Sequence, residues 1–305
     1  MARLDGKGKF AAPGSVRYRA HLEQKLARDR EFNRKLLNAF PGAAAAYSLR
    51  DLTGDRLAPV VRVRRSSDNA EKDFAAVDVA DGSLVAWVGA GNDGLVPVWY
   101  DQSGNGNDAA QTAATGQPRI VRSGALIIDG GLEYSSSRDD VLIAPNDASF
   151  RQQNFTLEAW IYNNSLTGFD GGIAFGNIFG GAGKFSYSMN FGDNNTPGRV
   201  GARLSDGVDV HFANADNVIE EKKWTHWAIS YDGSALKTYK NSTEISSLSV
   251  ETTVDYSVFA DNFYIGNRGL PELTDFPLDG KIKDVRFWGR VLSPSELQSI
   301  VAHGA

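Results

Sequence analysis

The sequence predicts a mostly β protein built as an antiparallel sandwich of two sheets. Short apolar or alternating segments follow one another at spacings of about ten to fifteen residues, and DG, NN, GG and DNN turns separate them. No stretch between these segments has the pattern of a helix that crosses from one parallel strand to the next. Antiparallel pairing is therefore the arrangement that the pattern favours.

The first forty residues differ from the rest of the chain. Residues 1–20 are rich in glycine and basic residues, and we expect them to gain order only on binding a partner. Residues 21–40 are mostly strong helix formers and end at Pro41. Four residues form an apolar seam along this predicted helix, namely Leu22, Leu26, Leu36 and Phe40. We therefore predict a basic arm and helix over residues 1–42 that serves as an anchor or an oligomerisation segment.

The sandwich is predicted over residues 43–305, and it opens with a β extension over residues 43–96. VVRVRR at residues 60–65 alternates, whereas LVAWV at residues 84–88 and LVPVWY at residues 95–100 are short apolar runs between turns. We interpret all three segments as strands.

The main body, predicted over residues 97–305, consists of a run of strands and closes with a helix. Its predicted strands are ALIID, DVLIA, NFTLEAWIY, FSYSMNF, RVGARL, VDVHF, WTHWAISY, LKTYKN, DNFYIGN and KIKDVRFW. In LSPSELQSIVAHG, Ser293 is the expected N-cap, Pro294 takes the first helical position and Glu296 completes a capping box.

Charge is unevenly distributed along the chain. The first forty residues carry ten Lys or Arg against four Asp or Glu, a net +6, so the rest carries −11 of the total net charge of −5. We expect the basic arm to contact an acidic protein surface and not nucleic acid. No run of about 18 apolar residues occurs, and the N-terminus lacks the apolar core of a secretory signal, so neither a membrane span nor a membrane partner is expected.

The chain has no cysteine and only four histidines. Disulfides, zinc–thiolate sites and cysteine nucleophiles are therefore excluded. The histidines form no HExxH pair of the kind that holds zinc in metal-dependent hydrolases.

The stretch WYDQSGNGND, residues 99–108, carries a side-chain oxygen at nearly every second position. These residues are Asp101, Ser103, Asn105 and Asn107. The alternation matches the first half of a calcium loop, but Thr112 stands where an EF-hand places a bidentate glutamate. The alternative is a turn in which Asp and Asn side chains bond backbone amides. The loop is a candidate structural Ca²⁺ site, and no other cofactor is expected.

Several stretches resemble the laminin-G-like branch of the concanavalin A-like lectin/glucanase superfamily. They are YDQSGNGNDAAQ, ALIIDGGLEYSSS, NFTLEAWIY, WTHWAISYDGSALKTYKN, FYIGN and LDGKIKDVRFWGRVLSPSEL, whose order and spacing agree over residues 97–302. The resemblance implies a concanavalin A-like jelly roll and a sugar- or surface-binding module, on a fold that hosts both lectins and glycanases.

The resemblance also implies a second metal candidate. In glycanases of this superfamily an aspartate on the corresponding late strand helps to hold Ca²⁺, and Asp284 stands at that position here. The alternative is a solvent-facing aspartate that pairs with Lys283 or Arg286.

The segment before the main body has a resemblance of its own. AAYSLRDL, VVRVRRSSDNAEKDF and VPVWYDQSGNGNDA resemble a segment of bacteriophage structural proteins, and also the opening of family-54 α-L-arabinofuranosidase catalytic domains. That hydrolase family implies a catalytic glutamate beside two adjacent cysteines. Because this chain has no cysteine and no matching stretch, we expect it not to be an enzyme.

Glycan hydrolysis requires two carboxylates about 5–10 Å apart. On FTLEAWIY, Glu158, Trp160 and Tyr162 share one face, which would line a concave sheet with Glu158 as acid and Trp160 as a sugar platform. The E-x-D-x-x-E pattern of glycanases with this fold is absent, so Glu158 is expected instead to be hydrogen-bonded or solvated. Further ligand contacts are predicted on two polar loops, at Asn163, Asn164, Asp193, Asn194 and Asn195.

Together these features predict a non-enzymatic bacteriophage virion protein, such as a head fibre, a capsid decoration protein or a tail component. Residues 1–42 would bind other virion proteins and support a homo-oligomer, with a trimer favoured. The sandwich would bind a cell-surface glycan weakly, and display in many copies would multiply that contact. The alternatives are a glycoside hydrolase of arabinofuranosidase type and a purely structural capsid decoration protein.

Overall fold

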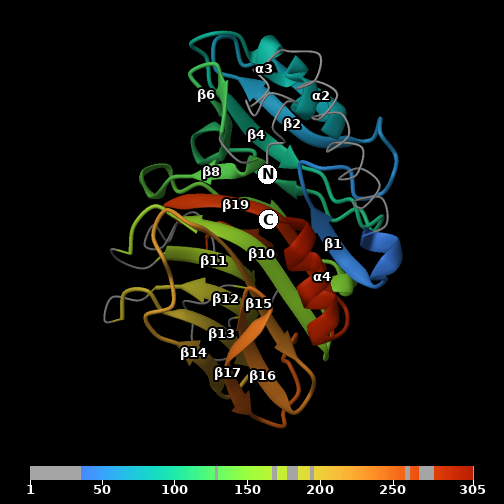
Figure 1. Ribbon diagram of the computed structural model, residues 1–305, viewed down its shortest axis with the longest axis vertical. Coiled ribbons are helices and arrows are strands. Elements are labelled where there is room, and N and C mark those ends of the chain that lie inside the picture. The colour runs from blue at the N-terminus through green and yellow to red at the C-terminus, as the bar shows by residue number, and fades with distance from the viewer. Residues whose placement is uncertain are drawn as a thin grey trace, which may run out of the picture.

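The computed structural model describes residues 36–127, 130–166, 170–176, 185–192, 196–257, 262–267 and 278–304. Figure 1 shows two packed sheets in the lower body and a lobe built from the N-terminal half above them. All strand pairs are antiparallel, which confirms the predicted mostly β sandwich.

One sheet, here called the back sheet, contains the longest strands. Its order is β1 (Ala43–Tyr47), β19 (Gly280–Trp288), β10 (Phe155–Asn163), β15 (Trp224–Tyr231), β16 (Ala235–Lys240) and β17 (Thr243–Ser249).

The second sheet, here called the front sheet, packs against the back sheet. Its order is β9 (Leu142–Ala144), β18 (Phe263–Ile265), β11 (Asp170–Gly176), β12 (Phe185–Phe191), β13 (Val200–Ser205) and β14 (Val210–Ala215). We call the surface of each sheet that points away from the other sheet its outer face.

The N-terminal lobe connects the two sheets. Its elements are β2 (Pro59–Arg65), β3 (Glu71–Ala75), α2 (Ala76–Asp81), α3 (Ser83–Val88), β4 (Gly94–Trp99), β5 (Ala109–Ala110), β6 (Arg119–Arg122), β7 (Ala125–Leu126) and β8 (Leu132–Tyr134). β5 pairs with β9 of the front sheet and β8 pairs with β19 of the back sheet, so the strands form one nearly closed surface. The predicted boundary at residue 96 is not a boundary in the fold, because β1 belongs to the back sheet and the lobe continues past β4.

One predicted strand is a helix. LVAWV lies in α3, where Leu84 and Val88 are both buried. Their spacing of four residues places them on one helix face. A short apolar run does not by itself distinguish a buried strand from a buried helical turn, which is why the sequence interpretation was wrong here.

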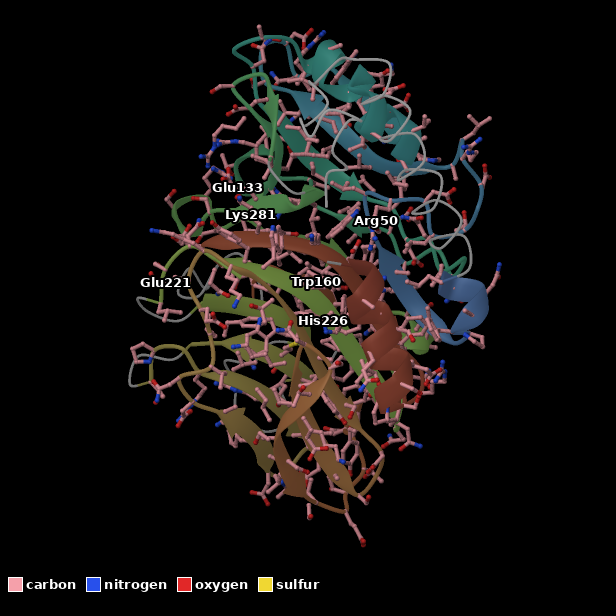
Figure 2. The ribbon with its side chains drawn as sticks, viewed as in Figure 1. Arg50, Glu133, Trp160, Glu221, His226 and Lys281 are labelled. Carbon is pink, nitrogen blue, oxygen red and sulfur yellow. The ribbon has the colours of Figure 1, made fainter. Side chains whose placement is uncertain are left out.

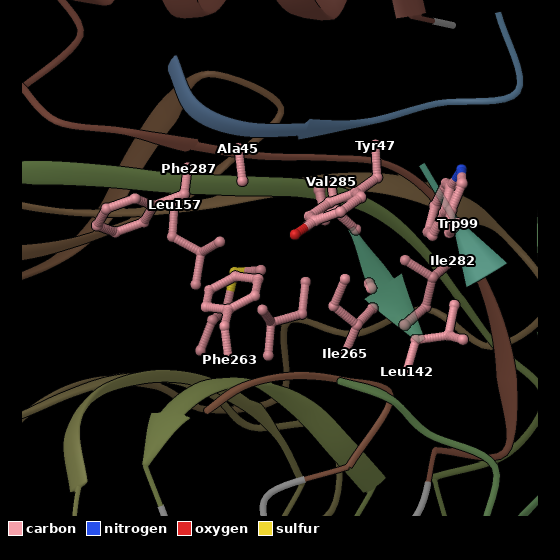
Figure 3. Close-up of a cluster of buried hydrophobic side chains, with 14 of the residues drawn as sticks. Ala45, Tyr47, Trp99, Leu142, Leu157, Phe263, Ile265, Ile282, Val285 and Phe287 are labelled. Carbon is pink, nitrogen blue, oxygen red and sulfur yellow. The ribbon is translucent and has the colours of Figure 1, made fainter. Parts of the chain in front are cut away.

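Alternation along the strands builds the core between the sheets. Leu157 and Phe287 of the back sheet face Phe263 and Ile265 of the front sheet (Figure 3). The ring centroids of Phe155 and Tyr187 lie 4.6 Å apart, and those of Tyr187 and Phe287 lie 5.0 Å apart. This aromatic stack fixes which side of each strand points inward.

The C-terminal helix α4 (Pro294–Gly304) lies across the outer face of the back sheet (Figure 1). The predicted capping box is confirmed: the Ser293 amide donates to Glu296 Oε2 at 2.7 Å, and the Glu296 amide donates to Ser293 Oγ at 3.3 Å. Leu297 and Ile300 pack against Trp288 and Ala228.

Two residues of the predicted N-terminal anchor belong to this same cluster. Leu36, in a helical turn over residues 36–39, is buried with Trp288 and α4, and Phe40 packs beside it. The prediction that Leu36 and Phe40 offer a free seam to a partner is therefore wrong, because the sandwich itself covers them. Leu22 and Leu26 lie outside the described residues.

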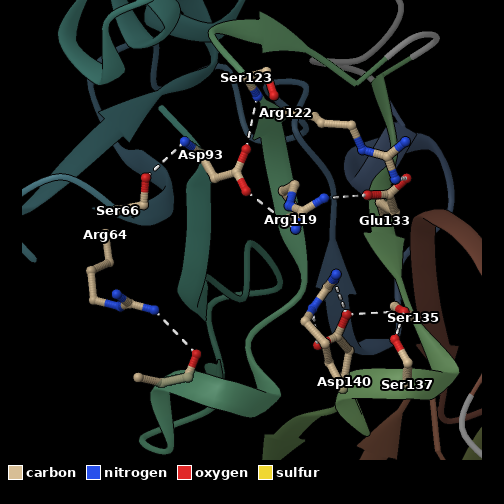
Figure 4. Close-up of polar contacts among 12 residues, drawn as sticks. Arg64, Ser66, Asp93, Arg119, Arg122, Ser123, Glu133, Ser135, Ser137 and Asp140 are labelled. Atoms are coloured by element: carbon tan, nitrogen blue, oxygen red, sulfur yellow. Dashed lines mark hydrogen bonds and ion pairs between the residues drawn. The ribbon is translucent and has the colours of Figure 1, made fainter. Parts of the chain in front are cut away.

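Ion pairs within the lobe connect β6 with β8, the strand that pairs with β19 of the back sheet (Figure 4). Arg119 lies 3.2 Å from Asp93 and 3.4 Å from Glu133, and Arg122 also pairs with Glu133. Nearby, burial raises the pKa of Asp140 to about 6, although Arg138 and the Ser135 amide oppose that shift.

Within the described ranges, no helix has the length and apolar character to cross a membrane.

Candidate functional site

Strand register places the outward side chains of the back sheet in rows. One row runs Arg286, Glu158, Ala228 and Tyr239 across four strands, and the next runs Lys283, Trp160 and His226. α4 lies over the first row and its last glycine reaches Trp160, because a Cβ built on Gly304 would lie 2.4 Å from Trp160 Nε1. The predicted sugar-facing side of β10 is therefore a covered surface.

Glu158 is the centre of a fully buried charged cluster. Its Oε2 lies 2.9 Å from His226 Nε2, and Arg286 Nε donates to its Oε1. Burial alone would raise the pKa of Glu158, but Arg286 and His226 outweigh that effect and hold the pKa below its usual value. Glu158 is thus hydrogen-bonded, which was one of the two expectations for this residue. The other expectation, that Glu158 contacts a ligand, is wrong because no solvent reaches its side chain.

Trp160 lies beside His226 of this cluster (Figure 2), and Tyr162 follows it on the same strand. Trp160 is only 5% exposed, so it is not the sugar platform that the sequence predicted. Tyr162 is half-buried, and its ring centroid lies 5.6 Å from that of Trp224. The Lys281 and Lys283 ammonium groups lie over Tyr162 and Trp224 at 4.5 and 4.6 Å, so lysines already cover these rings.

The predicted loop contacts after β10 also have structural partners. The carbonyl of Asn163, a buried residue, accepts from the Lys222 amide, and Asn164 Nδ2 donates to Asp279 Oδ1 at 2.9 Å. Their prediction as ligand contacts is not supported by this geometry. Asp193, Asn194 and Asn195 lie outside the described residues.

Asp284 lies at a β-bulge in β19. Between the pairs Lys283–Trp160 and Arg286–Glu158, β19 has one residue more than β10, and Asp284 there has a φ of 55°. Because of this extra residue, the side chains of β19 on both sides of the bulge stay in step with those of β10, and Val285 points into the core.

The Asp284 carboxylate is buried and is held by protein groups. It accepts from Ser48 Oγ at 2.6 Å and pairs with Arg50. Burial would raise the pKa of Asp284, but Arg50 and Arg286 outweigh it and hold the pKa below its usual value. The expectation that Asp284 faces solvent is therefore wrong, and its Arg50 partner was missed.

The polar loop at residues 101–107 is hydrogen-bonded to β1. Asp101 Oδ1 accepts from the Ala46 and Ser103 amides at 2.8 and 2.9 Å, and Oδ2 accepts from Ser103 Oγ and the Asn107 amide at 2.7 and 3.0 Å. Asn105 and Asn107 both donate to the Ala44 carbonyl. This is the turn geometry that the sequence analysis held as the alternative.

Among the residues that the structure describes, no three His, Asp or Glu side chains are grouped to hold a metal ion. Calcium binding by the 101–107 loop or by Asp284 stays a prediction.

The outer face of the front sheet has a different character. Register pairs Arg203 with Phe212 and Gly201 with Asn214, all on the side away from the core. Phe212 is 45% exposed, and the Arg203 guanidinium lies 5.4 Å from its ring centroid. Asn214 Oδ1 occupies the space that a Cβ on Gly201 would fill, at 2.2 Å. The half-buried Asn214 amide makes no hydrogen bond within the described part of the chain. An aromatic ring, a guanidinium and an unpaired amide therefore share one rigid surface.

Two carboxylates flank the turn between β13 and β14, at one end of this sheet. Asp206 accepts from the Val208 and Asp209 amides at 3.0 and 2.7 Å, and His211 Nε2 lies 2.8 Å from its Oδ2. The backbone amide of Asp209 and the His211 side chain hold the pKa of Asp206 far below its usual value. Asp255 lies against the same turn, since a Cβ on Gly207 would be 2.7 Å from its Oδ2.

These front-sheet residues were not predicted from the sequence, although a signal was present. In RVGARL and VDVHFANA, Arg203, Phe212 and Asn214 alternate with the core residues Ala202 and Ala213. The turn at Asp206 and Gly207 joins the two strands as a hairpin, which would have aligned them on one face.

Family comparison agrees with the fold. The model of the concanavalin A-like lectin/glucanases superfamily matches residues 135–298. The chain belongs to this superfamily. Its fold is thus one that hosts lectins and other carbohydrate-binding proteins. No curated protein matches the chain.

Solved structures of arabinofuranosidases share the architecture. One, in complex with arabinofuranosyl-α-1,2-xylobiose, is 14% identical with a TM-score of 0.61, and the match covers 89% of this chain and 64% of that chain. A mutant of a family-54 α-L-arabinofuranosidase soaked with 4-nitrophenyl α-L-arabinofuranoside is 13% identical with a TM-score of 0.63 and the same coverage. The likeness shows a shared fold, and this chain spans less than two thirds of the length of either protein.

These matches correct the expectation that the chain is not an enzyme. That expectation depended on the missing cysteine pair, a local motif, whereas the match to glycoside hydrolases extends over 89% of the chain.

Proposed function

We propose that the outer face of the front sheet binds a polysaccharide that carries arabinofuranosyl residues. The observation that carries the proposal is the unpaired Asn214 amide beside the exposed Phe212 ring and the Arg203 guanidinium. The arabinofuranosidase structures, which share the fold over 89% of this chain, supply the sugar class.

The chemistry of the three side chains suits a sugar. An aromatic face packs against the C–H face of a sugar ring, and amide and guanidinium groups hydrogen-bond to its hydroxyls. Because all three side chains come from adjacent strands of one sheet, they require little ordering when the ligand binds.

Binding is tested by affinity electrophoresis in gels that contain branched arabinan or unbranched xylan. We expect retardation by arabinan, and Phe212→Ala should weaken it about tenfold, since the aromatic contact is lost. Val77→Ala, which removes an exposed apolar side chain from α2, is the matched control. Equal retardation of the wild type and Phe212→Ala would place the sugar elsewhere.

Hydrolysis of arabinofuranosides is the second candidate, favoured by the carboxylates at the β13–β14 turn. A glycosidase needs one carboxylic acid to protonate the leaving oxygen and one carboxylate to attack the sugar or to activate water. Asp206, kept ionised by its partners, suits the carboxylate role, and Asp255, which lies against the same turn, is the second carboxyl group of the pair.

The assay is release of 4-nitrophenol from 4-nitrophenyl α-L-arabinofuranoside. Turnover should fall by about a hundredfold or more in Asp206→Asn and in Asp255→Asn. Asp216→Asn, which breaks only the exposed pair with Arg199, should leave it unchanged. Absence of turnover in the wild type would reject hydrolysis of this substrate and leave the binding proposal to its own test.

We further propose that the protein is part of a bacteriophage virion. Residues 1–42 would then contact other virion proteins, the chain would form a trimer, and the bound glycan would belong to a cell surface. Light scattering of the full chain tests the trimer, and a monomer at all concentrations would reject it.

A further inference from the structure

A cavity of about 380 Å³ lies on the outer face of the back sheet, far from the front face in the fold. It opens where α4 begins, between that helix and strands β15, β16 and β17. Its floor and walls are formed by Ser230, Asp232, Lys237, Tyr239, Ser242, Glu244, Val291, Leu292, Ser293, Pro294 and Glu296. The volume is within the range of about 300–1,000 Å³ that small-molecule sites occupy.

Two buried hydroxyl groups in this cavity have hydrogen-bonding capacity to spare. Ser230 is 2% and Tyr239 7% exposed, and both line the cavity. Their only hydrogen bond in the described structure joins Ser230 Oγ to Tyr239 Oη at 3.4 Å, which is long for two hydroxyl groups. A buried hydroxyl with so weak a partner gains from a better one.

The charged groups of the cavity disfavour an anion. Lys237 is paired with Glu244 at 2.9 Å, and Glu296 is paired with Arg290. At the start of α4, Pro294 has no N–H and the Glu296 amide is used by the Ser293 hydroxyl in the capping box. Asp232 adds a carboxylate to the lining. Burial would raise the pKa of Asp232, but hydrogen bonds from the Ser234 amide and hydroxyl outweigh burial and hold the pKa below its usual value. The cavity therefore offers acceptors and hydroxyls, and its one lysine is already paired.

The remaining lining completes the chemistry of a sugar site. Val291, Leu292 and Pro294 line the helix side of the cavity, and Tyr239, which lines it from the sheet, belongs to the same buried cluster as Leu292. A sugar ring has an apolar C–H face and carries hydroxyl groups on its edge. Its face can pack against the apolar wall while its hydroxyls bond to the carboxylates and hydroxyls of the cavity.

We propose that this cavity is a second saccharide site, which takes a neutral sugar unit through the Ser230 and Tyr239 hydroxyls. The sugar hydroxyls donate to Asp232 and Glu244 at the rim, and the sugar packs against the α4 wall. The site is separate from the front face. One protein molecule would therefore bind a single polysaccharide chain at two positions, or two polysaccharide chains at once. Two linked weak sites raise the apparent affinity well above that of either site.

The experiment titrates ¹⁵N-labelled full-length protein with xylotriose and follows amide shifts. The concentration should reach about ten times a Kd on the order of 1 mM. We expect saturable shifts at residues 237–244 and 291–296. Tyr239→Phe and Ser230→Ala, which remove one hydroxyl each and keep the packing, should each weaken binding about fivefold to tenfold.

The controls separate this site from the front face and from an anion site. Phe212→Ala should leave these shifts unchanged, and trigalacturonate, an acidic trisaccharide, should bind less well than xylotriose. The proposal is overturned if xylotriose produces no saturable shift at these amides, if both hydroxyl variants bind as the wild type does, or if trigalacturonate binds better.

Discussion

The outer faces of the two sheets are built by the same alternation and have opposite chemistry. On the back sheet, Glu158, His226 and Arg286 are charged or polar, fully buried and bonded to one another. On the front sheet, Phe212 is 45% exposed, and the half-buried Asn214 amide has no bond to any described residue. A carboxylate next to tryptophans therefore does not identify a sugar site. Hydrogen-bonding capacity that faces solvent is the better criterion.

The cause of the difference is the helix at the end of the chain. α4 covers the middle rows of the back sheet, and every charge beneath it must be paired or pay a large desolvation cost. The outward side chains of β12, which are Ser186, Ser188 and Asn190, are buried, but no described helix covers β13 and β14 as α4 covers the back sheet (Figure 1). At these two strands the front face can therefore present groups whose partners come from outside.

The largest effect is expected from Glu158→Gln. The substitution keeps the shape of the side chain but leaves the Arg286 charge buried without its carboxylate. We expect the free energy of unfolding to fall by about 3–5 kcal/mol, measured by urea denaturation. The exposed pair Arg199–Asp216 supplies the matched control, and Asp216→Asn should stay close to the wild type. If the two variants lost the same stability, the buried cluster would not hold the back face together.

A second effect is expected on acidification. The carboxyls of Glu158 and Asp284 have a lower pKa in the folded chain than their usual values of 4.5 and 3.8. A group of this kind stabilises the fold above its unfolded pKa, and the contribution is lost as pH falls through the folded pKa. Stability should therefore decline below about pH 5, and Asp284→Asn should flatten that decline. Parallel pH profiles of the wild type and the variant would show that Asp284 does not contribute.

Much of the fold could be predicted from the sequence, and the reason is local. VVRVRR, NFTLEAWIY and WTHWAISY alternate clearly, and the Ser293–Glu296 capping box marks the helix end by itself. α3 could not be separated from a strand, because six residues are too few to show a period.

The site was harder to predict because it depends on which face a helix covers. Both faces of β10 carry large side chains, and the sequence does not tell which of them α4 will bury. The bulge at Asp284 depends on the pairing of β19 with β10, and the ion pair of Asp284 with Arg50 joins residues more than two hundred positions apart. Such contacts follow from topology and not from local pattern.

A smaller effect is expected at the helix that creates the difference. Ser293→Ala removes the hydroxyl that caps the Glu296 amide and should destabilise the protein by about 1 kcal/mol. Gln298→Ala, at an exposed position further along the helix, is the control, whereas Ser295 is unsuitable because its hydroxyl bonds to that of Ser293. Because α4 forms a wall of the back cavity, Ser293→Ala should also increase hydrogen exchange at residues 294–300. Unchanged exchange there would mean that the cap does not hold α4 in place.

The smallest effect on stability, and the sharpest test of the comparison, is expected from Asn214→Ala. The side chain is half-buried and has no hydrogen bond to lose within the described chain, so the free energy of unfolding should change by less than about 0.5 kcal/mol. Binding of arabinan should nevertheless weaken about fivefold to tenfold, since a hydrogen bond to the sugar is lost. Ser247→Ala, an exposed position on β17 of the back sheet, should change neither quantity. An Asn214→Ala variant that is clearly destabilised would mean that the front face is held by its own polar contacts, as the back face is, and the distinction between the two faces would then fail.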